Sequence, residues 1–247
     1  MLRKRVITVL TFNDGVLFRT KLFRPDYRYT LNFVDAWSVD EIIVLDVTRP
    51  GQGLKENFFR VIEDFAGRCF VPLATGGGLR TLDDVRRHME LGADKVVVNT
   101  GALDRRPFIN EISKQFGSQC VVASIDAKRN DDGKYEVFAE FGTRSTGISP
   151  AAWAKEAEEM GAGEVMITSI DRDGWLQGYD LDLVKSVTNA VSVPVLTLGG
   201  AGNWKHFADA FEAGAAGTCT QNIYHFTERS IHSAKTYLKD AGVAVRE

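Results

Sequence analysis

An internal repeat of about 123 residues is the feature that most constrains how this chain can fold. Its markers are a glutamate that opens an apolar strand, a glycine pair after a strand and a Gly-Ala pair before one: Glu41 and Glu164, Gly76-Gly77 and Gly199-Gly200, Gly92-Ala93 and Gly214-Ala215. The first two pairs of markers are 123 residues apart, and the third pair is 122 residues apart. Self-similarity at one offset indicates a fold built from two similar halves.

The offset shortens near the start of each half. Thr11 and Asp126, which both follow apolar runs, are only 115 residues apart. The chain takes 30 residues from Thr11 to Glu41, and 38 residues from Asp126 to Glu164. The first strand–helix unit of the first half is therefore predicted to be the shorter one.

Within each half, short β-branched runs alternate with amphipathic segments. We predict strands near residues 5–12, 41–47, 70–74, 95–99, 120–126, 164–169, 195–198 and 217–221. Helix-start signals stand at Thr81, Ser149-Pro150, Asn203 and Thr227. Eight strand–helix units without a Ser- or Pro-rich linker predict one α/β domain over residues 1–247, a (β/α)8 TIM barrel of two four-unit half-barrels.

Composition excludes several other classes of protein. The 30 basic and 33 acidic side chains give a formal charge of −3, so no global basic field favours nucleic acid. The three cysteines form no CxxC pair and no metal-ligand spacing, and no apolar run reaches the roughly 18 residues of a membrane span. We expect a cytoplasmic protein with reduced cysteines, no membrane partner, no metal and no cofactor.

Glycine-rich turns follow the third strand of each half, at Gly76–Gly78 and Gly199–Gly200. Barrels of this kind carry their chemistry at the carboxyl ends of the strands. Glycines there let backbone N–H groups approach an anion, so two such turns suit a long substrate with a phosphate at each end. The alternative is that these glycines only permit tight turns from strand to helix.

Asp126 follows the apolar run CVVASI and is the candidate general acid or base. The alternative is a structural carboxylate that binds loop amides. Asp46, Asp171 and Asp173 are interpreted as residues that order loops. The four histidines show no metal-binding or nucleophile-activating pattern.

Charged residues stand at or just before the opposite ends of four strands. They are Arg5, Glu41, Lys95 and Glu164. Two acids and two bases can form a neutralised ring across the bottom of the barrel, and the alternative is four separate, solvated side chains.

Over nearly its whole length the chain resembles HisF, the cyclase subunit of imidazole glycerol phosphate synthase. The matching stretches are KRVITVL, DEIIVLDVT, GGGLRTLDDVRR, LGADKVVVNTGAL, FGSQCVVASIDAKR, GAGEVMITSIDRDG, GYDLDL, VSVPVL, GGAGNWKHF and the HF within Tyr224-His225-Phe226. The combination of GSQ-VV-IDAKR with TS-DRDG--GYDL is highly specific for the superfamily.

The resemblance implies a glutaminase partner and a path for ammonia through the barrel. HisF-type barrels receive ammonia from a HisH-like class I glutaminase at the barrel bottom, behind a charged gate that Arg5, Glu41, Lys95 and Glu164 match. Asp94 and Gln119 match the face that docks the glutaminase. Gly78, Asn99 and Thr100 match one phosphate site, Gly174 and Gly200 match part of the other, and Asp126 matches one of two catalytic aspartates.

The chain also departs from HisF. Thr11 stands where the second catalytic aspartate is expected, and threonine cannot act as a carboxylate acid or base at neutral pH. Gln221-Asn222 replaces small residues of the second phosphate site. Trp175 and Leu198 replace smaller residues and are expected to narrow the mouth or that site.

Because it lacks the first-strand aspartate, the chain resembles a side branch of HisF-like proteins that are encoded with surface-polysaccharide genes. These proteins are thought to pass ammonia from a HisH-like glutaminase to an N-acetyl-sugar amidotransferase. A stretch like LFRTKLFRPDYRY follows the replaced aspartate in that branch, as it does here, although TLN stands where a Gly-Asp-Pro-like turn is usual.

Three hypotheses therefore remain. The first is an ammonia-conducting subunit that activates a glutaminase and lacks cyclase activity. The second is a working histidine-pathway cyclase that tolerates Thr11, and the third is a scaffold that only docks a sugar amidotransferase. A phosphorylated small molecule or phosphate ions are expected at the barrel top in the first two.

An aromatic and basic segment follows the first strand. It contains Phe18, Arg19, Lys21, Phe23, Arg24, Tyr27, Arg28 and Tyr29. Aromatic and arginine side chains are favoured at interfaces, so this segment either docks the next enzyme or lies over the mouth as a solvated loop.

Overall fold

The computed structural model describes residues 3–21, 23–28, 39–221 and 231–246, without the side chains of residues 19, 20, 24–28 and 231. Eight parallel strands form a closed barrel in the order β10-β11-β12-β1-β4-β5-β6-β7, and β7 pairs with β10 to close it. Their bounds are β1 Arg5–Asn13, β4 Glu41–Asp46, β5 Leu73–Gly76, β6 Lys95–Val98, β7 Val121–Arg129, β10 Glu164–Ser169, β11 Val195–Leu198 and β12 Gly217–Thr220. The predicted (β/α)8 TIM barrel is confirmed.

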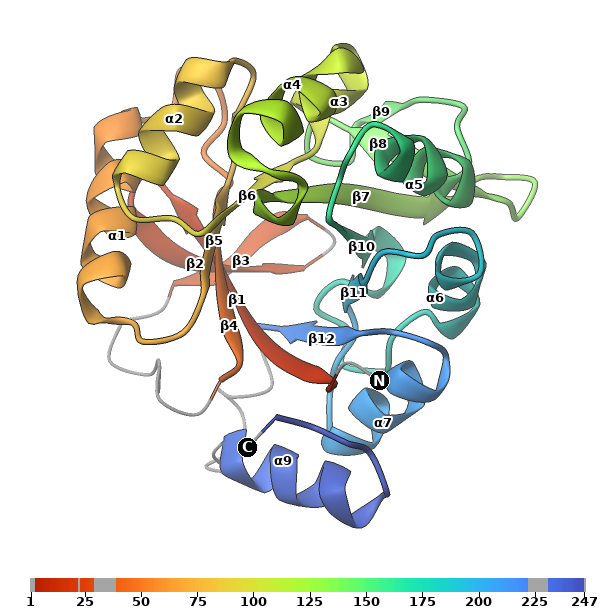
Figure 1. Cartoon of the computed structure of the whole chain (residues 1–247). Coiled ribbons are helices and arrows are strands. Elements are labelled where there is room, and N and C mark those ends of the chain that lie inside the picture. Colours follow the sequence, from red (N-terminus) through yellow and green to blue (C-terminus); the bar gives the residue numbers. More distant parts are fainter. Residues whose placement is uncertain (1–2, 22, 29–38, 222–230, 247) are drawn as a thin grey trace.

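Helices surround the barrel in Figure 1. They are α1 Lys55–Arg68, α2 Leu82–Glu90, α3 Thr100–Asp104, α4 Pro107–Phe116, α5 Pro150–Glu159, α6 Leu181–Thr188, α7 Trp204–Glu212 and α9 Ile231–Asp240, with the short turns η2 Ser118–Cys120 and η3 Ile170–Arg172. Each amphipathic helix packs its apolar stripe on the outer face of the strands, which accounts for a large continuous core between the two layers. No helix in the described ranges is long and apolar enough to cross a membrane.

Three of the predicted helix starts are confirmed by their caps. Thr81 begins α2 with a capping box, because its hydroxyl accepts from the Asp84 amide while the Asp84 carboxylate accepts from the Thr81 amide. Ser149 and Asn203 accept hydrogen bonds from the amides of Ala152 and His206. The start predicted at Thr227 lies outside the described residues.

The register of the strands confirms the alignment of the two halves. Thr11 pairs with Leu45, and Asp126 pairs with Thr168. Leu45 and Thr168 are themselves 123 residues apart. Thr11 and Asp126 therefore occupy the same place in their half-barrels, although the chain between the first and second strands differs in length.

Each half also carries a β-hairpin that the sequence analysis did not predict. One hairpin consists of β2 Val16–Lys21 and β3 Arg24–Arg28, and the other of β8 Tyr135–Ala139 and β9 Arg144–Ser145. β2 pairs with the end of β1, and β8 pairs with the end of β7. The aromatic and basic segment is thus largely strand, and β7 runs three residues past Asp126 because β8 continues its ladder.

The third strand begins later than predicted. The prediction placed it at residues 70–74, whereas β5 spans Leu73–Gly76. Phe70 is 78% exposed, and the following Pro72 has no N–H to donate to a ladder. Phe70 and Pro72 therefore belong to the connection at the bottom of the barrel.

Candidate functional site at the two ends of the barrel

Four charged side chains close the bottom of the barrel. Arg5 contacts Glu41 and Glu164, each at 2.7 Å, and Lys95 contacts the same two acids at 2.9 and 3.0 Å. The four side chains are at most 16% exposed. Because each acid binds both bases, they form the neutralised ring that the sequence predicted, and the alternative of four solvated residues is wrong.

Above the ring, the barrel interior is apolar. Its inward-facing layer consists of Ile7, Val9, Ile43, Ala74, Val97, Val122, Met166, Leu196 and Cys219. The Cys219 thiol interacts electrostatically with all four charges of the ring, and burial raises its pKa. A neutral molecule can cross such an interior at far lower cost than an ion, because an unpaired buried charge loses its hydration.

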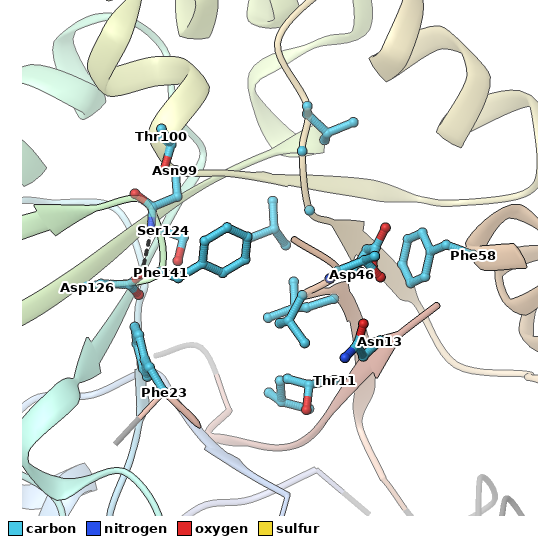
Figure 2. A pocket seen from close by; sticks show the side chains of 18 of the residues that line it. Thr11, Asn13, Phe23, Asp46, Phe58, Asn99, Thr100, Ser124, Asp126 and Phe141 are labelled. Carbon is cyan, nitrogen blue, oxygen red and sulfur yellow. Dashed lines mark hydrogen bonds between the residues drawn. The ribbon is translucent and has the colours of Figure 1, made fainter. Parts of the chain in front are cut away.

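A cavity of about 1150 Å³ opens at the other end of the barrel. It reaches down to Val97, Met166 and Cys219 and up to the turns that follow the strands. Figure 2 shows Phe23 and Phe141 near Asp126, with Thr11, Asn13 and Asp46 across the cavity. Each phenylalanine comes from a hairpin tip and has a left-handed backbone, with φ of 59°.

The two hairpins meet over this cavity. A side chain at Gly142, in the second hairpin, would contact the ring of Phe23 at 3.1 Å. Phe23 donates its amide hydrogen to Asp173 at 3.1 Å, and Lys21 lies 4.3 Å from the ring centre of Trp175. The described part of the aromatic segment therefore lies over the mouth, which is one of the two predicted alternatives.

Asp126 is half-buried at the mouth. Its carboxylate accepts a hydrogen bond from the Asn99 amide at 2.7 Å, and the Thr168 hydroxyl also donates to it. Burial raises the pKa of Asp126 to about 7, since these two donors only partly offset the loss of hydration. A carboxyl that titrates near neutral pH can both take and release a proton.

Thr11 forms hydrogen bonds that hold neighbouring elements together. Its hydroxyl donates to the Phe18 carbonyl at 2.6 Å, and Gln221 bonds both Thr11 and the same carbonyl. Thr11 and Gln221 are each 8% exposed. They tie β1 and β12 to the first hairpin and bring no second carboxylate to Asp126.

The glycine turns differ from one another. A side chain at Gly77 would approach the Asp46 carbonyl to 2.2 Å, and one at Gly200 would approach the Gly178 carbonyl to 2.2 Å. A side chain at Gly78 would meet nothing within 4 Å. Close packing therefore explains Gly77 and Gly200, whereas Gly78 leaves backbone open to the cavity, and anion binding stays a prediction.

The chain can now be assigned to a family. A family model described as histidine biosynthesis protein matches residues 8–230. The chain belongs to this family. The assignment agrees with a HisA- or HisF-type barrel, and the charged ring and Asp126 occupy the two ends of that barrel.

Within this family member, most of the predicted mouth residues come together. Gly77, Gly78, Asn99, Thr100, Asp126, Gly174, Gly199, Gly200 and Gln221 all line the cavity with Thr11. Gly76 lies just below them, where a side chain would be 2.6 Å from the Val97 carbonyl. Asn222 lies outside the described residues.

Two mouth residues have roles other than those expected. Asn99 directs its amide to Asp126, and Thr100 accepts a hydrogen bond from the Glu140 amide at 3.0 Å. Trp175 is 44% exposed and does not line the cavity, so it does not narrow this cavity, and its effect on the second phosphate site stays a prediction. Leu198 does line the cavity.

The remaining predicted residues have these positions. Asp94 and Gln119 are exposed at the bottom, and Asp94 accepts from the Leu73 amide at 2.8 Å. Asp46 and Asp171 accept from the amides of Thr48 and Arg129, so they order loops as Asp173 does. The described ranges hold no cluster of three His, Cys, Asp or Glu residues fit for a metal.

Sequence reasoning missed His88. It lies on α2, is 3% exposed and lines the cavity. Its position on the buried stripe of α2, beside Val85, was the available signal. A histidine on such a stripe is polar in an otherwise apolar row and needs a partner.

Proposed function

We propose that this barrel is the ammonia-conducting subunit of a glutamine amidotransferase and that it lacks cyclase activity. The observation that carries the proposal is the closed ring of Arg5, Glu41, Lys95 and Glu164. A buried ring of this kind costs desolvation, so it favours a role at an entrance over a role in stability alone.

The apolar interior of the barrel supports this role because it admits neutral molecules more readily than ions. Ammonia is small and neutral, and it can pass an apolar layer that excludes ammonium and hydroxide. The same layer separates the ring from the cavity, where Asp126 has a pKa near 7. A solute that entered through the ring would emerge beside a group able to exchange a proton with it.

A HisH-like glutaminase is the proposed donor, docked over the exposed Asp94 and Gln119. The proposed acceptor is an N-acetyl-sugar amidotransferase of surface-polysaccharide synthesis, or its phosphorylated substrate at the mouth. Thr11 supports an altered use of the mouth, because its hydroxyl is committed to the Phe18 carbonyl. The cyclase reaction then lacks one member of its acid–base pair.

The first experiment measures coupling. A HisH-like glutaminase encoded near this chain is assayed with and without the barrel, and we expect the barrel to raise glutaminase kcat/KM. Amide-labelled ¹⁵N-glutamine in excess unlabelled ammonium then reports the path, because a conducted nitrogen stays labelled in the final product. Unchanged glutaminase activity would contradict the proposal and favour a scaffold that docks only the amidotransferase.

A working cyclase is the second candidate, and the half-buried Asp126 with its pKa near 7 is the observation that favours it. The test supplies the phosphoribulosyl-formimino substrate of the histidine pathway with excess ammonium at alkaline pH. Turnover that Asp126→Asn abolishes would establish the cyclase and show that Thr11 is tolerated. Folded protein without turnover would exclude it.

A further inference from the structure

The cavity continues past the barrel mouth into a side chamber between α1 and α2. We define this side chamber by Asp46, Phe58, Phe59, Gly77, Arg87 and His88, all of which line the cavity. It lies on the outer face of β4 and β5, away from Asp126, and Figure 2 shows Phe58 beside Asp46 there.

The side chamber exists because one outward position has no side chain. Val44 and Thr75 pair across β4 and β5, and both point toward the helices. The next outward positions along these strands are Asp46 and Gly77. Gly77 has φ of +112°, and a side chain there would meet the Asp46 carbonyl at 2.2 Å, so the space above Thr75 stays open.

His88 forms the floor of the side chamber. Its Nδ1 atom lies 2.8 Å from the Thr75 hydroxyl, and its ring centre lies 5.9 and 6.0 Å from those of Phe58 and Phe59. Its Nε2 atom has no hydrogen-bond partner within the described part of the chain. Burial lowers the pKa of His88 to about 4, so the ring is neutral at physiological pH.

Asp46 is the carboxylate of the side chamber that has no ion-pair partner among the described residues. It accepts a hydrogen bond from the Thr48 amide at 2.9 Å, and Lys55 attracts it only weakly. Burial therefore raises its pKa despite these two interactions. The other charged groups around the chamber already have partners: Lys55 bonds Asp84, Arg80 bonds Asp104, Asp83 bonds Arg86, and Arg87 stacks on Phe59 and faces Glu90.

We propose that the side chamber is a binding site for a small primary ammonium cation. A carboxylate, two aromatic rings and an unused imidazole nitrogen are the groups that recognise such a cation. Asp46 accepts N–H hydrogen bonds from the cation and neutralises it, and the aromatic faces stabilise its charge. When Nδ1–H donates to Thr75, the lone pair of Nε2 accepts a further N–H. The site does not depend on whether the barrel conducts ammonia.

The test uses methylammonium chloride and the imidazole signals of selectively ¹⁵N-histidine-labelled protein near pH 8. The chain has four histidines, and loss of one signal in His88→Gln identifies His88. We expect the His88 signal to shift saturably with methylammonium. Sodium chloride supplies a cation without N–H groups, and tetramethylammonium chloride tests cation–π attraction alone, so neither should reproduce the shift.

Variants locate the site. Asp46→Asn should weaken binding by about tenfold or more, and Phe59→Leu by severalfold, since each removes one recognition group. Asp64→Asn is the matched control, because Asp64 on α1 pairs with Arg68 and does not line the cavity; it should leave binding unchanged. The proposal is overturned by equal shifts with sodium chloride, or by binding that survives Asp46→Asn. If Asp46→Asn does not fold, undiminished binding in Phe59→Leu overturns it.

Discussion

At the mouth of the barrel, the first half presents a hydroxyl where the second half presents a carboxylate. Thr11 and Asp126 occupy matching registers, yet Thr11 bonds a backbone carbonyl, whereas Asp126 is half-buried and has a pKa near 7. At the bottom the two halves have stayed alike, since Glu41 and Glu164 each bind both Arg5 and Lys95. The two halves therefore carry the same residue type at the bottom of the barrel and different residue types at the mouth.

The outer faces of the two halves differ as well. His88 sits on α2 in the first half, and the corresponding residue of α7, 122 positions later, is Ala210. The strand registers make Thr75 and Thr197 the matching residues, one residue out of step with the repeat of the glycine pairs. Of these two threonines, only Thr75 has a histidine to bond. The first half therefore has a polar residue at this outer position, where the second half has an apolar one.

The largest expected effect tests the symmetry of the ring. Glu41→Gln removes one buried acid and leaves two bases sharing Glu164, so we expect it to cost about 3–5 kcal/mol. Glu164→Gln should cost less, because the Glu164 side chain is 11% exposed and that of Glu41 is 1% exposed. Urea unfolding of both variants at neutral pH measures this order. A larger cost for Glu164→Gln would contradict it.

The second prediction concerns the carboxylate at the mouth. The folded-state pKa of Asp126 is raised to about 7, so the stability that its protonated form contributes is lost as pH rises from about 4 to 7. Asp126→Asn stays neutral, and we expect it to be about 3–4 kcal/mol more stable than the wild type above pH 7. Below about pH 4 the advantage should vanish. Chemical unfolding across this range measures the difference, and a constant difference would refute the assignment.

The third prediction concerns the outer face of the first half. The folded-state pKa of His88 is lowered to about 4, so the contribution of His88 to stability should fall as pH drops from about 6.5 to 4, where the unfolded chain binds a proton first. The expected loss is about 2–3 kcal/mol. His88→Leu should flatten this slope. His206→Gln, on the more exposed α7 position of the second half, should change the slope less, and equal effects would contradict the proposed asymmetry.

The smallest effect is expected at Thr11. Thr11→Val removes the hydroxyl that bonds the Phe18 carbonyl, and the loss of that hydrogen bond should cost about 1 kcal/mol. The cost should not depend on pH between about 4 and 8, in contrast to Asp126→Asn. Thermal unfolding at several pH values compares them. A pH-dependent change would mean that Thr11 is coupled to a titrating group.

Much of the fold could be predicted because the eight strands and the repeat are local patterns. The hairpins were missed, although Asp14-Gly15 and Asp132-Gly133 stand at the turns that lead into them, from β1 to β2 and from β7 to β8, and Gly15 and Gly133 have positive φ. Such Asp-Gly pairs are strong hairpin signals, but the aromatic and basic residues around Asp14-Gly15 favoured a loop.

The ring was predictable for another reason: parallel strands of one barrel start at the same edge, so charges at strand starts must meet. The role of Asn99 was not predictable. Asn99 has the unusual backbone angles φ −132° and ψ −97°, and tertiary contacts decide that its amide turns to Asp126. The chamber of His88 likewise depends on an empty position at Gly77, which no local pattern marks.

β1 is the one strand that carries Arg5 at one end and Thr11 near the other. It runs without a break over nine residues, about 30 Å at the usual rise, and then turns directly into the hairpin that bears Phe23. A strand held on both sides by barrel ladders cannot stretch, so an axial displacement of Arg5 moves Thr11 and the base of the hairpin with it. The charged ring at the bottom and the cavity at the mouth are thereby mechanically linked through a single rigid element.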